Sequence, residues 1–174
     1  VHAARAGVLQ LRDRAMQVSI LGGLAAEFTI AQWFSGSPTT LAEQRGNVVL
    51  MEFWAPRCRS CAAMFAFLND LHDRYADRGL TVLALTGYRG ASGGRTHDDD
   101  LIRNAITEHS IDFRVGVTAD DSLRKHYGAT GIPTFAVVDS IGVVRLASSK
   151  PDRAALEDVI VRLLDADTEE EFRP

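Results

Sequence analysis

Apolar and polar positions alternate along the chain with two different periods, and the changes of period predict its elements. Residues 47–54 and 80–85 are nearly continuous apolar runs rich in β-forming side chains, which is typical of strands buried on both faces. Between them, apolar side chains recur every three or four residues from Cys61 to Tyr75, and Gly79 stands where such a helix should end. Because a helix-length segment joins the two strands, we expect them to be parallel neighbours.

The second half of the chain continues this alternation. Further segments with the same periods predict a helix, a strand, a short helix, the two strands of a hairpin and a closing helix, over residues 101–106, 113–117, 122–127, 134–138, 143–147 and 156–164. The acidic residues 98–100 come before the first of these, at the positive end of its dipole. Strands and helices that alternate around one sheet give an α/β domain.

The first 23 residues form an extension with a pattern of its own. Apolar residues spaced by three and four alternate there with arginines, which predicts a short amphipathic helix over residues 1–21 with the apolar stripe Val8, Leu11, Ala15 and Val18. We expect this helix to pack on the flank of the domain. The alternative is a membrane-surface or partner-binding role, since arginines can meet anionic lipid. The extension is followed by a domain over 24–166 and an acidic, solvated tail over 167–174.

Composition and charge narrow the function classes. The chain has 174 residues, of which 46% are hydrophobic and 24% charged, as in an ordinary globular domain. Its formal net charge of −4 argues against a nucleic-acid partner, which needs a basic face. No run reaches the roughly 18 consecutive apolar residues of a membrane span, although the start at Val1 leaves room for a signal peptide or membrane anchor upstream.

The chain's two cysteines, Cys58 and Cys61, lie where the first buried strand meets the first long helix. At a helix N-terminus, backbone N–H groups and the helix dipole stabilise a thiolate, and Arg57 and Arg59 add positive charge. We expect Cys58 to attack a disulfide and Cys61, one turn along, to resolve the product. The alternatives are two structural cysteines or half of a metal site. The histidines lack paired ligand spacing, so we expect no metal and no cofactor besides the cysteine pair.

Two segments carry a resemblance to a known family. Residues 52–61 (EFWAPRCRSC) resemble the active-site segment of thioredoxin, and residues 131–134 (GIPT) resemble its cis-proline segment. The resemblance runs from about Leu24 to Ala166, and an additional helix and strand before Pro133 make the chain look like the TlpA/ResA-type thiol–disulfide oxidoreductases. It implies a thioredoxin-like fold, with a central mixed β-sheet flanked by helices, an N-terminal extension and a central helix–strand insertion.

The resemblance also implies roles for single residues. Cys58 and Cys61 match the redox pair. Pro133 matches the proline beside the disulfide, whose preceding peptide bond is cis in the family. Ile132 matches the residue whose backbone pairs with a substrate chain, and Trp54 matches the tryptophan beside the active site. For Trp54 and Ile132, simple packing is the alternative.

Glu52 matches a buried acid of classical thioredoxins near the resolving cysteine. A carboxyl group in an apolar strand tends to have a raised pKa and can exchange a proton with Cys61. The alternative is a side chain at the sheet edge that reaches solvent or pairs with an arginine. The chain departs from the family at Arg57, usually tryptophan, and at Ala66, usually proline. Arg57 should favour the thiolate and an acidic partner surface.

These observations predict a thiol–disulfide oxidoreductase that acts on protein substrates through a mixed disulfide, more as a reductase than an oxidase. It would need an upstream electron donor, act as a monomer and work outside the cytoplasm, either free or on a membrane anchor upstream of Val1. A cytoplasmic location is the alternative. One alternative is a redox-inactive binding module that uses residues 1–21 and the loop 87–94. Another is a thiol peroxidase, although the threonine of its P-x-x-x-T-x-x-C pattern is missing before Cys58.

Overall fold

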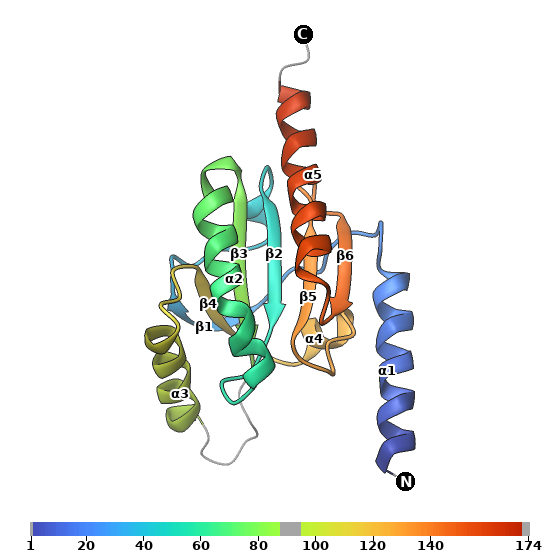
Figure 1. The fold of residues 1–174 in the computed structure, drawn as a ribbon, viewed down its shortest axis with the longest axis vertical. Coiled ribbons are helices and arrows are strands. Elements are labelled where there is room, and N and C mark those ends of the chain that lie inside the picture. The colour runs from blue at the N-terminus through green and yellow to red at the C-terminus, as the bar shows by residue number, and fades with distance from the viewer. Residues whose placement is uncertain (1, 88–94, 172–174) are drawn as a thin grey trace.

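Six strands form one mixed sheet in the computed structural model, which describes residues 2–87 and 95–171 (Figure 1). The strand order is β1-β4-β3-β2-β5-β6. The strands are β1 (Ile30–Ser35), β2 (Val48–Phe53), β3 (Leu80–Thr86), β4 (Arg114–Thr118), β5 (Thr134–Val138) and β6 (Val144–Ser149). The helices are α1 (His2–Ser19), α2 (Arg59–Tyr75), α3 (Arg95–Glu108), α4 (Ser122–His126) and α5 (Arg153–Glu171), with short 3-10 turns η1 (Ala42–Gln44) and η2 (Ala76–Arg78).

The pairing of the central strands confirms the prediction from the apolar runs. β2 runs parallel to β3, and β3 runs parallel to β4, while β5 and β6 form the expected antiparallel hairpin on the other side of β2. All six residues of β2 and all seven of β3 are buried, so both faces of these strands are covered. The fold is α/β with a mixed sheet, as expected.

Helices cover the two faces of the sheet unequally. The larger cluster of buried side chains joins α2, α3 and α5 to one face, through residues that include Leu50 of β2, Leu68 of α2 and Ile160 of α5. The smaller cluster lies on the opposite face and includes Met51 of β2, Leu123 of α4 and Tyr127. β2 therefore lies between the two clusters, and its end leads directly into the cysteine segment (Figure 1).

The helix α2 ends as its sequence indicates. η2 follows it directly, and Gly79 then takes a left-handed conformation with φ of 94°. Glycine adopts this conformation without the steric cost that a side chain brings. The turn delivers the chain into β3, whose first residue pairs with the first residue of β2.

The N-terminal helix α1 packs through its polar face and leaves its apolar stripe exposed. It stands beside β6 at the edge of the sheet (Figure 1). Asp13 and Gln17 are the buried residues of its described part, whereas Val8, Leu11 and Val18 are 50%, 67% and 70% exposed. The helix thus lies on the flank of the domain, and its polar face makes the contact because the surface that it meets offers hydrogen-bonding groups.

Three other segments differ from the pattern or extend it. β1 was not predicted, since it is an edge strand whose residues are mostly half-buried and whose pairing with β4 carries two irregularities. α5 continues to Glu171, into the stretch assigned to the tail. The predicted glycine-rich loop lies outside the described residues except for Gly87.

None of the described helices has the length and apolar character needed to cross a membrane.

Candidate functional site

Cys58 and Cys61 form a disulfide at the N-terminus of α2, with their Cα atoms 5.3 Å apart. Cys58 caps the helix, and its Sγ accepts a hydrogen bond of 3.2 Å from the backbone N–H of Cys61. The Ser60 hydroxyl lies 3.4 Å from the same sulfur. One sulfur is therefore surrounded by groups that can donate hydrogen bonds at the positive end of the helix dipole, where a thiolate is stabilised.

The two cysteines differ in exposure. Cys61 is fully buried and belongs to the core cluster under α2, while Cys58 is only partly buried against that cluster. An external disulfide can reach Cys58 but not Cys61. Which cysteine attacks and which one resolves stays a prediction.

Glu52 is fully buried in the middle of the sheet. Its neighbours across the sheet are Ala84 and Phe135, both members of the cluster that also contains Cys61. Neither carboxylate oxygen has a hydrogen-bond partner among the described residues, and burial raises the pKa of this carboxyl group well above its ordinary value. The alternative of a side chain at the sheet edge, in solvent or paired with an arginine, is wrong.

Trp54 is also buried, directly after β2. Its ring lies edge-on to the Phe65 ring of α2, with 5.2 Å between the ring centroids. With 3% of its surface exposed, the side chain cannot itself form a docking face for a protein substrate. Its contact with Phe65 holds the first turns of α2 against the end of β2, which is the segment that carries the dithiol.

The loop before β5 contains the predicted proline. The Ile132–Pro133 peptide bond is cis, and Pro133 is buried. Ile132 is half-buried against the same core cluster as Cys58. The loop is tied to its surroundings, since the Thr134 hydroxyl donates to the Gly131 carbonyl (2.6 Å) and the Lys150 backbone N–H donates to the Pro133 carbonyl (3.1 Å).

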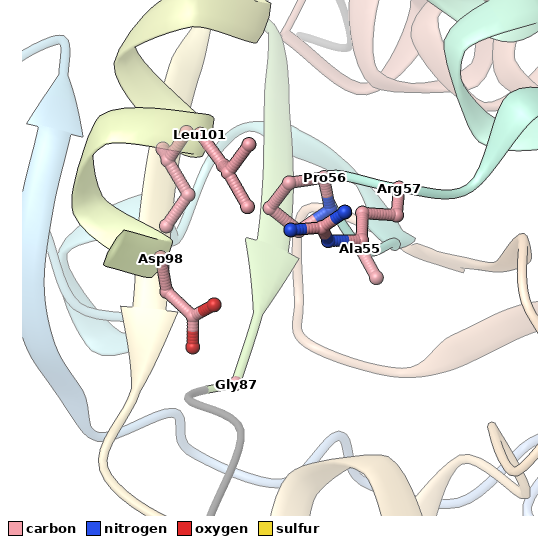
Figure 2. Close-up of a pocket in the computed structure, with 7 residues that line it drawn as sticks. Ala55, Pro56, Arg57, Gly87, Asp98 and Leu101 are labelled. Atoms are coloured by element: carbon pink, nitrogen blue, oxygen red, sulfur yellow. The ribbon is translucent and has the colours of Figure 1, made fainter. Parts of the chain in front are cut away.

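Arg57 is exposed immediately before Cys58, on the other flank of the active-site segment. Together with Ala55, Pro56 and residues of α3 it lines a cavity of about 30 Å³. Figure 2 shows Leu101 of α3 pointing toward Pro56, and the carboxylate of Asp98 near the end of β3 at Gly87. This cavity is small, having room for about one water molecule.

Two features of the site were not predicted. One is Ser60, whose hydroxyl approaches the Cys58 sulfur; a residue between the cysteines was the available signal. The other is the contact of α1 with the cis-proline loop, in which the Gln17 amide donates to the Gly128 carbonyl and to the Ser149 hydroxyl, both at 3.1 Å. Gln17 carried no sequence signal, because a polar residue on an amphipathic helix normally faces solvent.

Comparisons with known proteins agree with this geometry. The family model described as Redoxin matches residues 25–160, which leaves α1 outside the match. The thiol-disulfide oxidoreductase ResA of Bacillus thuringiensis subsp. konkukian is 22% identical over 144 residues, which are 82% of this chain and 78% of that protein. The chloroplastic protein SUPPRESSOR OF QUENCHING 1 of Arabidopsis thaliana is 30% identical over 134 residues, which are 76% of this chain and 12% of that protein.

Solved structures share the fold. A thiol-disulfide isomerase from Corynebacterium glutamicum superposes with a TM-score of 0.71 at 20% identity, over 82% of this chain and 96% of that one. A putative thiol:disulfide interchange protein DsbE from Chlorobium tepidum superposes with a TM-score of 0.61 at 25% identity, over 80% and 99% of the two chains. The fold is therefore that of thioredoxin-like proteins.

Proposed function

The chain belongs to the redoxin family and is a thiol–disulfide oxidoreductase of the TlpA/ResA-like group, and from this premise we propose that it reduces disulfides in other proteins through Cys58 and Cys61. The observation that carries the proposal is the pair's asymmetry. One sulfur caps α2 and is partly exposed, and the other is sealed in the core one turn further on.

The proposed reaction has two exchange steps. In the reduced protein, the Cys58 thiolate attacks one sulfur of a substrate disulfide; a Cys58–substrate disulfide forms, and the other substrate sulfur leaves as a thiolate and takes up a proton. The Cys61 thiol then loses its proton and attacks the Cys58 sulfur. The Cys58–Cys61 disulfide forms, the second substrate thiolate leaves, and two electrons have passed to the substrate.

Glu52 accepts the Cys61 proton in this proposal. Two observations support it: the carboxylate lies on the sheet face covered by α2, and it has no other hydrogen-bond partner among the described residues. A carboxyl group whose pKa is raised by burial is a better base near neutral pH than an ordinary glutamate. The proton would then leave with the departing substrate thiolate.

The remaining parts of the proposal concern the partners. The Ile132 backbone pairs with the substrate polypeptide as an added strand beside Cys58. An upstream dithiol donor returns the Cys58–Cys61 disulfide to the reduced form. The TlpA/ResA resemblance favours reduction over oxidation and a compartment outside the cytoplasm.

Insulin reduction tests this function directly. We expect turnover by the wild type with a dithiol donor, and background rates for Cys58→Ser and Cys61→Ser. Cys61→Ser should also accumulate a mixed disulfide that Cys58→Ser does not form. Ala66→Ser serves as the matched control, because it places a serine on the exposed side of the same helix and should keep full activity. An inactive wild type, or an active Cys58→Ser, would overturn the proposal.

The direction of electron flow needs a second measurement. Equilibrating the protein with defined thiol–disulfide buffers gives the potential of the Cys58–Cys61 couple. A reductase should lie well below the oxidising range, for which DsbA at about −120 mV is the reference. A value near that reference would assign the opposite direction.

A further inference from the structure

A second cavity adjoins the cis-proline loop on the side where α1 stands. Its volume is about 330 Å³, roughly ten times that of the cavity beside Arg57. Its walls come from three places: the polar face of α1, the Gly131–Pro133 segment, and the end of β6 at Ser148–Lys150. The wall that contains Ile132 is the one on which a substrate backbone is proposed to pair. The cavity therefore adjoins the residue at which the substrate polypeptide is proposed to bind.

The cavity is fixed by contacts on both sides. Gln17 bridges α1 to the Gly128 carbonyl and the Ser149 hydroxyl, and the Thr130 hydroxyl donates to the Asp13 carboxylate. The helix also lies directly on the Gly128 backbone, where a Cβ atom would stand 2.8 Å from the Asp13 carbonyl oxygen. Only glycine allows that approach, so the position of α1 beside the loop is specified by the chain itself.

The charges around this cavity favour an anionic ligand. Arg14 and Lys150 both line it, both are exposed, and neither has an ion-pair partner within residues 2–87 and 95–171. Among the described residues of the lining, Asp13 is the one carboxylate, and it already accepts a hydrogen bond from Thr130. The lining is thus net positive in a chain whose formal charge is −4.

Lys150 is held in an unusual conformation at the rim. Its φ is 53°, in the left-handed region that a lysine rarely adopts, and its N–H is bonded to the Pro133 carbonyl. Such conformations cost free energy and are concentrated at ligand-binding segments. The Lys150 backbone is therefore held in place beside the cis-proline, and it carries a cationic side chain there.

We propose that this cavity binds an acidic segment of the polypeptide substrate, next to the substrate's disulfide, with Arg14 and Lys150 as the charged contacts. The proposal rests on the proposed function, because it takes the binding of the substrate at Ile132 from it. It makes α1, which lies outside the family match, part of the substrate-binding surface.

A binding experiment tests the charged contacts without any redox step. The probe is a fluorescent peptide with three aspartates beside a serine in place of the substrate cysteine, and its binding is followed by anisotropy. The test variant, Arg14→Gln/Lys150→Asn, removes both cavity charges while asparagine tolerates the left-handed backbone. The control, Arg12→Gln/Lys125→Gln, removes two exposed charges outside the cavity and so has the same net charge.

We expect the test variant to bind the peptide about tenfold more weakly than the wild type, and the control to bind within about twofold of it. High salt should remove most of that difference, since the contacts are exposed. Equal weakening of both variants would mean that only net charge matters and would overturn the site. Binding of the wild type to an asparagine version of the peptide with the same affinity would overturn the acidic preference.

A kinetic arm separates this inference from the function on which it rests. With disulfide peptides that carry aspartates or asparagines, the wild type should prefer the acidic peptide about tenfold in kcat/KM, and the test variant should lose that preference. If neither peptide is reduced, the proposed function fails while the binding result still decides the site. If both are reduced equally, the function stands and the site fails. A preference for oxidised glutathione that depends on Arg14 and Lys150, without one for the peptide, would also overturn the site.

Discussion

The helices α1 and α2 have the same kind of amphipathic sequence, yet they attach to the sheet in opposite ways. α2 docks with its apolar stripe, and Cys61, Phe65, Leu68 and Leu71 are at most 1% exposed. α1 leaves its apolar stripe in solvent and docks with a polar pair, Asp13 and Gln17. α2 carries the reacting sulfurs at its N-terminus, and α1 borders the loop that is proposed to bind the substrate.

This difference predicts that the two helices are attached to the sheet with unequal strength. Each large apolar side chain buried under α2 contributes about 1.5–3 kcal/mol, so the dithiol rests on an element that cannot detach without unfolding the core. A hydrogen bond such as those of α1 has a net contribution of about 0.5–1.5 kcal/mol. Local opening of α1 is therefore expected to cost less free energy than opening of α2.

The largest effect should follow from truncating the apolar face of α2. We expect Leu68→Ala to lower the free energy of unfolding by about 2–5 kcal/mol, because the side chain is fully buried and leaves a cavity in the main cluster. Denaturant unfolding followed by circular dichroism measures this change. If the free energy of unfolding fell by less than about 1 kcal/mol, the apolar face of α2 would not be tightly packed. The contrast between α1 and α2 would then fail.

Glu52 is the exception under α2, since it is a polar group without a described partner in an apolar region. Its pKa is raised in the folded protein by burial, so the folded state holds its proton at pH values where the unfolded state has lost it. The contribution of Glu52 to stability is therefore full below the unfolded pKa and is lost as the pH rises through the folded pKa. A glutamine at position 52 has nearly the same shape as the protonated glutamate and stays uncharged at every pH.

We accordingly expect Glu52→Gln to match the wild type near pH 4 and to exceed its stability at pH 8 by about 1–3 kcal/mol. Unfolding of the oxidised proteins across this pH range measures the gap. A gap that stays constant with pH, or that grows toward acid, would contradict a buried carboxyl with a raised pKa. The same variant should slow the decay of the mixed disulfide if Glu52 accepts the Cys61 proton.

The sequence predicted the α2 region better than the α1 region for a physical reason. The strand at 48–53 and the stripe of α2 are buried by apolar contact, which hydrophobic periodicity reports directly. The Cys58–Cys61 spacing and Pro133 are local motifs, so they were found without knowing what lies around them. Docking of α1 depends instead on the Gly128 carbonyl and Ser149 hydroxyl, more than 100 residues away in sequence. No local pattern encodes such a partner.

A smaller effect is expected at the polar contact of α1. Gln17→Ala removes the amide that donates to Gly128 and Ser149, and it should cost about 1 kcal/mol, felt by α1 alone. Hydrogen exchange resolves this, since amide exchange in α1 should rise about fivefold while exchange in α2 stays unchanged. Faster exchange in both helices would mean that α1 and the core open together.

The smallest effect is expected from Leu11→Ala, which is the matched comparison for Leu68→Ala. Both changes remove the same atoms from the apolar stripe of a helix, but Leu11 is 67% exposed and Leu68 is fully buried. We expect Leu11→Ala to change the free energy of unfolding by no more than about 0.5 kcal/mol. A cost close to that of Leu68→Ala would show that the stripe is buried in solution, which would mean that α1 packs through its apolar face. The cavity beside Ile132 would then lose its Arg14 wall, so this single measurement also tests the geometry on which the substrate segment depends.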